Sequence, residues 1–111
     1  MEISEQRRGD IIVLIPTGRI NNDTSTSFQP KLLESVASPG SKVLIDFSSV
    51  EYISSAGLRA LMMASKQSKA INGRLAVAGL TPMVKEIFAI SRFSMVVQVF
   101  ETTDEAIKAL S

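Results

Sequence analysis

Two adjacent serines, Ser54 and Ser55, are the residues of this chain best placed to take part in chemistry. They stand between an apolar run at residues 43–45 and a stretch from Leu58 onward whose apolar residues recur at helical spacing. Either serine can cap that helix by accepting a hydrogen bond from an unpaired amide of its first turn. The same amides and the helix dipole favour negative charge, so either hydroxyl could also carry a phosphate without unwinding the helix.

The residues that follow the serine pair have two interpretations each. Gly57 has no Cβ, so the backbone of another protein or a nucleotide phosphate could approach closely, and the same property also permits close packing of the helix on a sheet. Arg59 lies one helical turn after Ser55 and can reach back to a phosphoserine, although an exposed arginine on a helix is usually just solvated. Capping serines are common, so a structural cap is the favoured interpretation of the serines taken alone, and spacing by itself leaves the function undecided.

Short apolar runs alternate with segments of helical spacing along the rest of the chain. Strands are expected over residues 2–8, 11–16, 42–47, 74–78 and 95–100. Helices are expected to begin at Asp23 or Thr24, at the serine pair, at Pro82 with Thr81 as its cap, and at residue 103. This order predicts a single domain over residues 1–111 with an α/β fold, in which a mixed sheet of about five strands is backed by about four helices.

Pro30 conflicts with a regular first helix that runs to about residue 37. Proline lacks an amide hydrogen and its ring crowds the preceding turn. We therefore expect residues 24–28 to be irregular, or the helix to be kinked.

Composition limits the kinds of function. The chain has 111 residues, of which 45% are hydrophobic, which suits one domain with its own core. Its 12 basic and 11 acidic residues form no basic block and aromatic residues make up 5%, so direct nucleic-acid binding has little support. The absence of Cys and His removes thiol nucleophiles, the usual imidazole base and the commonest zinc ligands. We expect no metal, no cofactor and no enzymatic activity.

The N-terminal residues and the lengths of the hydrophobic runs bear on the cellular location of the protein. The first ten residues lack an apolar core, and no stretch approaches the ~20 apolar residues that span a bilayer. The absence of Cys is compatible with a reducing compartment. We therefore expect no targeting sequence, no membrane insertion and a cytoplasmic location.

Two segments resemble the STAS domain family. Residues 43–59, VLIDFSSVEYISSAGLR, resemble its signature of an apolar strand, Asp-x-Ser, a hydrophobic-x-Tyr step, and a serine followed by a small residue, Gly and Leu. Residues 17–28 resemble the family's loop between its second strand and first helix. The resemblance covers nearly the whole chain and, within the family, is to the bacterial anti-sigma-factor antagonists.

The resemblance implies that Ser55, which precedes the small residue and the glycine, is the phosphorylation site, with Ser54 as the second choice. The antagonists often have Asp where this chain has Ser54 and Asn21. Asp23, two positions after Asn21, either compensates for a missing carboxylate or caps the first helix. Fewer acidic groups near Ser55 should reduce the repulsion that a phosphate experiences.

A docking strip is expected on the outer face of the serine helix. Arg59, Met63 and Lys66 fall close together there, and an exposed methionine between two cations suits adaptable protein contacts, although single exposed apolar residues are common. The full set of expected partner-binding residues is Asn21, Asp23, Ser54, Gly57, Arg59, Met63 and Lys66.

The resemblance implies a function in partner switching. Unphosphorylated antagonist would bind an anti-sigma-factor serine kinase and release the sigma factor, phosphorylation of Ser55 would end binding, and a serine phosphatase would reverse it. The main alternative is a non-switching STAS scaffold subunit of a signalling or transporter-associated complex, in which Ser55 is only a cap. A nucleotide or lipid bound beside Gly57 ranks third, and an enzyme ranks last.

Overall fold

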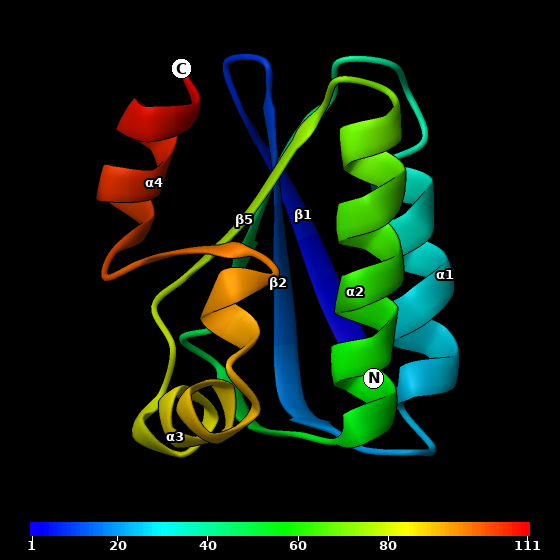
Figure 1. The fold of residues 1–111 in the computed structure, drawn as a ribbon, viewed down its shortest axis with the longest axis vertical. Helices are drawn as coiled ribbons and strands as arrows, with labels where there is room; N and C mark the ends of the chain where they lie inside the picture. The colour runs from blue at the N-terminus through cyan, green and yellow to red at the C-terminus, as the bar shows by residue number, and fades with distance from the viewer.

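The alternating elements fold into a six-stranded mixed sheet with helices on both faces, as the computed structural model of all 111 residues shows (Figure 1). The strands are β1 (Glu2–Arg8), β2 (Ile11–Ile20), β3 (Lys42–Asp46), β4 (Val50–Ile53), β5 (Arg74–Ala78) and β6 (Gln98–Phe100). The helices are α1 (Ser25–Ser35), α2 (Ser55–Ala70), α3 (Pro82–Ser91), the 3₁₀ helix η1 (Phe93–Met95) and α4 (Thr103–Leu110). None of the helices has both the length and the hydrophobicity needed to cross a membrane.

The sheet has the order β1-β2-β3-β5-β6. Only the opening hairpin of β1 and β2 is antiparallel, because helices α1, α2 and α3 make the crossovers that lead to β3, β5 and β6. β4 lies off this path and pairs in parallel with the far end of β2, beyond an irregularity at Gly18 and Arg19. As a result the carboxyl ends of β2 and β4 lie at the same edge of the molecule.

Helices cover both faces of the central strand β3, which explains its unbroken apolar run. Val43 and Ile45 pack with residues of α1, α2 and α3, whereas Leu44 packs on the opposite face with Ala106 and Leu110 of α4. All three β3 side chains are fully buried. In Figure 1, α1 and α2 lie side by side on one face and α4 lies on the other.

The predicted mixed sheet with four α-helices is confirmed, with several differences in detail. The sheet contains six strands because β4 was not predicted, and β2 continues four residues past Pro16 in order to pair with it. The last strand is shorter than residues 95–100, because Phe93 turns inward to contact Phe88 with ring centroids 5.3 Å apart. Thr81 precedes α3 as expected, but its hydroxyl donates to the Val50 carbonyl at 2.8 Å instead of capping that helix.

Pro30 lies inside a continuous α1, so the predicted irregular segment over residues 24–28 is wrong. Its ring is on the exposed side of the helix. The carbonyl of Thr26, four residues earlier, loses its intrahelical donor, and because Thr26 is also exposed that carbonyl can be hydrated. A water molecule can therefore replace the missing hydrogen bond in part.

One ion pair joins α1 to the edge strand β1. Lys31 Nζ lies 3.0 Å from Glu5 Oε1, and the hydrogen bond to this carboxylate, followed by its charge, raises the pKa of Lys31. Because both side chains are partly exposed, solvent screening leaves this pair a minor contribution to stability.

Pro30→Ala is expected to raise the free energy of unfolding by about 1–3 kcal/mol. Alanine supplies an amide that can donate to the Thr26 carbonyl, and it has a higher helix propensity than proline. Urea unfolding of the wild type and the variant measures the change. Pro39→Ala is the matched control, because Pro39 lies in the loop after α1 and its replacement only loosens the unfolded chain. A Pro30→Ala variant no more stable than Pro39→Ala would contradict this account.

Candidate functional site

The serine pair lies where the N-terminus of α2 meets the ends of two parallel strands. Ile20, the last residue of β2, is in register with Ile53, the last residue of β4. The amide of Ser54 donates to the Ile20 carbonyl at 2.7 Å. The loop before α1 and the first turn of α2 are therefore held at one edge, as is usual for loops that follow neighbouring parallel strands.

Ser54 is the residue that caps α2. It has an extended backbone, is 7% exposed, and its Oγ accepts from the amide of Gly57 at 3.3 Å. Its carbonyl accepts the amide of Leu58 at 2.9 Å, the first bond of the helix. Ser55 is the first helical residue, and its exposed hydroxyl makes no hydrogen bond within the protein. The cap is therefore supplied by Ser54, and the hydroxyl of Ser55 is left free at the surface.

Gly57 is required for packing. A Cβ at this position would lie 2.7 Å from Ile20 Cγ2 and 2.7 Å from Ile53 Cγ1, which real Cβ atoms do not tolerate. The glycine is buried beneath the first turn of α2. Of its two interpretations, close packing of the helix on the sheet is the one that the geometry supports.

Asn21 organises the turn before α1. Its Oδ1 accepts from the amides of Asp23 and Thr24, each at 2.9 Å, and its own amide donates to Thr24 Oγ1 at 2.8 Å. Thr24 Oγ1 in turn donates to the Arg19 carbonyl at 2.7 Å. An asparagine can make this Asx-type turn as well as an aspartate can, without its charge.

Asp23 does not cap α1. The N-cap residue is Thr24, and the Asp23 carboxylate is exposed and forms neither a hydrogen bond nor an ion pair. Its side chain stays free at the surface, near the end of β2.

The predicted strip on α2 touches α1 at Met63, whereas Arg59 lies on the side that faces α3 and η1. Arg59, Met63 and Lys66 are all exposed, and Met63 is 41% accessible. Gln29 of α1 places its Nε2 3.8 Å from Met63 Sδ, within the range of a weak hydrogen bond to sulfur. The three side chains of the strip are therefore open to solvent, with α1 adjoining at Met63.

A second apolar surface borders Ser55 directly and was missed by the sequence analysis. It is an open depression of about 310 Å³ that is lined by Ser55, Leu58, Arg59, Met62, Ser91 and Phe93. Arg59 is the one charged residue in this lining. Ile90, which is 77% exposed, precedes Ser91 at the end of α3. No spacing rule within α2 could have found this surface, because two of its lining residues, Ser91 and Phe93, come from the α3–η1 segment.

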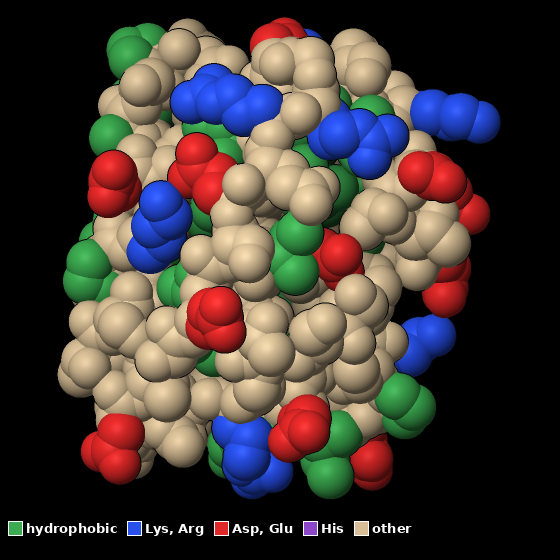
Figure 2. Space-filling model, turned by 180° about the vertical axis from the view of Figure 1, so that it is seen from behind, with side chains coloured by type: hydrophobic (Ala, Val, Ile, Leu, Met, Phe, Trp, Pro, Cys, Tyr) green, Lys and Arg blue, Asp and Glu red, His purple; other side chains and the backbone are tan.

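Charges elsewhere on the surface are mixed in sign. On the face opposite to that of Figure 1, Lys and Arg side chains are interspersed with Asp and Glu side chains, and no broad area of one sign forms (Figure 2). This distribution agrees with the formal net charge of +1.

Residues 2–106 match the family model of the STAS domain. The chain belongs to the STAS domain family.

Known proteins resemble this one along nearly their whole length. BtrV of Bordetella bronchiseptica, assigned as an anti-sigma factor antagonist, is 28% identical over 109 residues, which cover 98% of this chain and 94% of BtrV. The crystal structure of a Thermotoga maritima protein with the same assignment has a TM-score of 0.90 at 18% identity and covers 97% of this chain and 93% of that one. The phosphorylated form of the Bacillus cell fate determinant SpoIIAA has a TM-score of 0.72 at 15% identity and covers 99% of this chain and 100% of that one.

The division of roles between the serines in this STAS domain predicts unequal effects on stability. Ser54→Ala is expected to lower the free energy of unfolding by about 1 kcal/mol, because the amide of Gly57 loses its acceptor. Ser55→Ala should change it by less than about 0.5 kcal/mol. Denaturant unfolding of both variants tests this, and equal losses would show that Ser55 shares the cap.

Proposed function

We propose that this STAS protein is a cytoplasmic anti-sigma-factor antagonist that acts by partner switching. In its unphosphorylated form it binds an anti-sigma-factor serine kinase, so that the sigma factor is released. Phosphorylation of Ser55 ends this binding, and a serine phosphatase restores it. The protein supplies the hydroxyl and the docking surface, and catalysis belongs to the kinase.

The observation that carries the proposal is the position of the Ser55 hydroxyl. It is exposed, free of the capping bond, and at the edge of the apolar depression formed with α3 and η1. A kinase can therefore reach it without opening the fold. A partner that covers the depression would bring this hydroxyl into a desolvated interface.

The relatives support the same role. BtrV and the Thermotoga maritima protein carry the antagonist assignment over nearly the full length of this chain. SpoIIAA is described in a phosphorylated form, and this chain shares its fold. A small regulatory domain of this kind fits the absence of His and Cys from the sequence.

Phosphorylation at the first residue of α2 is compatible with the folded protein. The first amides of a helix have no intrahelical acceptor, and here Ser54 satisfies only that of Gly57. The free amides and the dipole at this end attract a negative group. Arg59, one turn along, lines the same depression and supplies a positive charge. The phosphate would therefore be accommodated without loss of the cap.

The same phosphate would oppose binding of a partner. It adds about −1.5 to −2 charge at pH 7, at the edge of a surface whose walls are mainly Leu58, Met62 and Phe93. A charge buried in an interface without sufficient compensation costs several kcal/mol, which corresponds to a loss of affinity of roughly a hundredfold or more. Binding can thus be switched without a change of fold.

The modification itself can be measured by intact-mass and fragment mass spectrometry of the protein isolated from its native cells. We expect a single phosphate on Ser55, because Ser54 is 7% exposed and engaged in the cap. Ser55→Ala should abolish it. The absence of phosphate under every growth condition would favour the non-switching scaffold, and a phosphate on Ser54 would show that the accessible hydroxyl is not the substrate.

Binding to the kinase that co-purifies from native cells tests the switch. Ser55→Asp is expected to weaken this binding strongly, towards the roughly hundredfold effect of a phosphate, whereas Ser55→Ala should retain it. Equal affinities of these two variants would contradict switching.

Two neighbouring variants on α2 map the surface that the kinase covers. Met62→Asp alters the depression beside Ser55, and Met63→Asp alters the strip next to α1. Because both methionine side chains are exposed, neither variant should unfold the domain. We expect both to weaken binding. Unchanged affinity of either variant would remove its surface from the interface.

A further inference from the structure

Every methionine of this protein lies at its surface. The five side chains have exposed fractions between 36% and 82%. Methionine is among the residue types most often buried, so its complete absence from the core is unusual. Oxidation of a buried methionine disrupts packing, whereas oxidation of exposed ones can leave the fold intact. These side chains are therefore open to a reversible modification.

Two of the methionines, Met62 and Met63, are adjacent on α2 and lie on the two surfaces proposed to bind the kinase. Met62 lines the apolar depression beside Ser55. Met63 belongs to the exposed strip that adjoins α1. An unbranched thioether suits adaptable contacts with a partner protein. A change of polarity at this pair would therefore act directly on partner binding.

The surroundings of Met63 favour its oxidised form. Gln29 Nε2 of α1 lies 3.8 Å from Met63 Sδ. A thioether sulfur is only a weak acceptor, whereas a sulfoxide is polar and its oxygen accepts strongly. After oxidation, Gln29 can donate a stronger hydrogen bond to that oxygen. This bond would hold the Met63 side chain against α1 and withdraw it from the strip.

Oxidation of Met62 would make the depression beside Ser55 more polar. The other large apolar side chains of its lining are Leu58 and Phe93. A sulfoxide buried against apolar groups of a partner, without a hydrogen-bond donor, is unfavourable. Oxidation at this position thus opposes the same contact that a phosphate on Ser55 opposes.

We propose that Met62 and Met63 form a redox-sensitive pair whose oxidation by a peroxide ends binding of the kinase. This inference rests on the proposed function, because it adds a second signal to the same surface. In each reaction the peroxide O–O bond breaks and an S–O bond forms, so that the sulfur gives two electrons to the peroxide. The transferred oxygen passes its proton to the departing hydroxide, which leaves as water.

Methionine sulfoxide reductases make the modification reversible. One enzyme acts on each sulfoxide epimer. The enzyme's dithiol is oxidised to a disulfide while the sulfoxide oxygen leaves as water. Because this chain has no Cys, its own sulfur chemistry is confined to its methionines.

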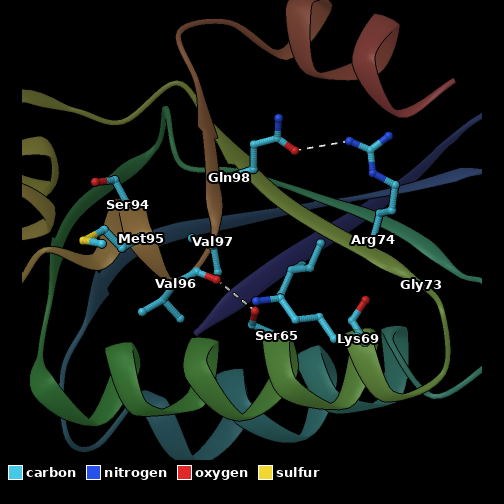
Figure 3. Close-up of a pocket in the computed structure, with 11 residues that line it drawn as sticks. Ser65, Lys69, Gly73, Arg74, Ser94, Met95, Val96, Val97 and Gln98 are labelled. Carbon is cyan, nitrogen blue, oxygen red and sulfur yellow. Dashed lines mark hydrogen bonds between the residues drawn. The ribbon is translucent and has the colours of Figure 1, made fainter.

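Two further methionines provide an internal control. Met83 on α3 and Met95 on η1 are 53% and 82% exposed, so a peroxide reaches them at least as readily as it reaches the pair. Neither lines the depression beside Ser55. Met95 instead lines a separate cavity between α2, β5 and the η1–β6 segment (Figure 3). An effect of exposure alone would therefore involve these two residues.

Peroxide treatment of the isolated protein tests the proposal. Hydrogen peroxide is added and then removed with catalase, sulfoxides are located by fragment mass spectrometry, and the kinase co-purified from native cells is added last. We expect sulfoxides on Met62 and Met63, and a loss of kinase affinity of about tenfold or more that sulfoxide reductases reverse. An oxidised pair with unchanged affinity would overturn the proposal. A pair that stays reduced while Met83 and Met95 are oxidised would do the same.

Matched double variants assign the effect to the pair. Each is compared with itself before and after peroxide, so its starting affinity does not matter. Met62→Leu/Met63→Leu keeps apolar side chains of similar volume that peroxide does not oxidise, and its affinity should not change on treatment. Met83→Leu/Met95→Leu should lose affinity as the wild type does. Equal losses in both variants would place the effect outside the pair and overturn the proposal, as would a loss that the reductases fail to reverse.

Failure of this inference can be distinguished from failure of the proposed function. Untreated protein that does not bind the kinase would contradict both. Binding that responds to Ser55→Asp but not to peroxide would overturn this inference alone.

Discussion

The close contact of Gly57 with Ile20 and Ile53 determines the arrangement of the whole site. It presses the first turn of α2 onto the ends of β2 and β4 and leaves no space for a side chain at position 57. In this position the amide of Ser54 donates a hydrogen bond to the Ile20 carbonyl, and the buried Ser54 side chain caps the helix. Because successive helical residues are turned by about 100°, the next side chain, Ser55, must leave this contact and face solvent.

Under the proposed switch, this arrangement separates stability from regulation within two adjacent residues. The cap that holds α2 in place depends on a hydroxyl that a kinase cannot easily reach, while the accessible hydroxyl contributes no hydrogen bond to the fold. A phosphate on Ser55 can therefore change the affinity for a partner while the domain remains folded. Asn21 makes a comparable contribution on the neighbouring loop, where it preserves an Asx-type turn without adding a negative charge near the site.

Features that depend on local sequence were predicted well, and features that depend on packing were not. β1 and β5 have the predicted bounds, because alternation and turn residues define them locally. β4 was missed because its four residues form a strand only when β2 extends past a bulge to meet them. The same limit applies to the site: the serine pair was found from the sequence, but which serine caps the helix depends on the buried contact at Gly57. The wall that α3 and η1 add beside Ser55 also arises only in the folded chain.

The two ends of α2 impose opposite requirements on an anion. At the N-terminus, unpaired amides and the positive end of the dipole favour negative charge, so a phosphate on Ser55 needs little from side chains beyond Arg59. At the C-terminus the dipole is reversed and the unpaired groups are carbonyls, which repel an anion.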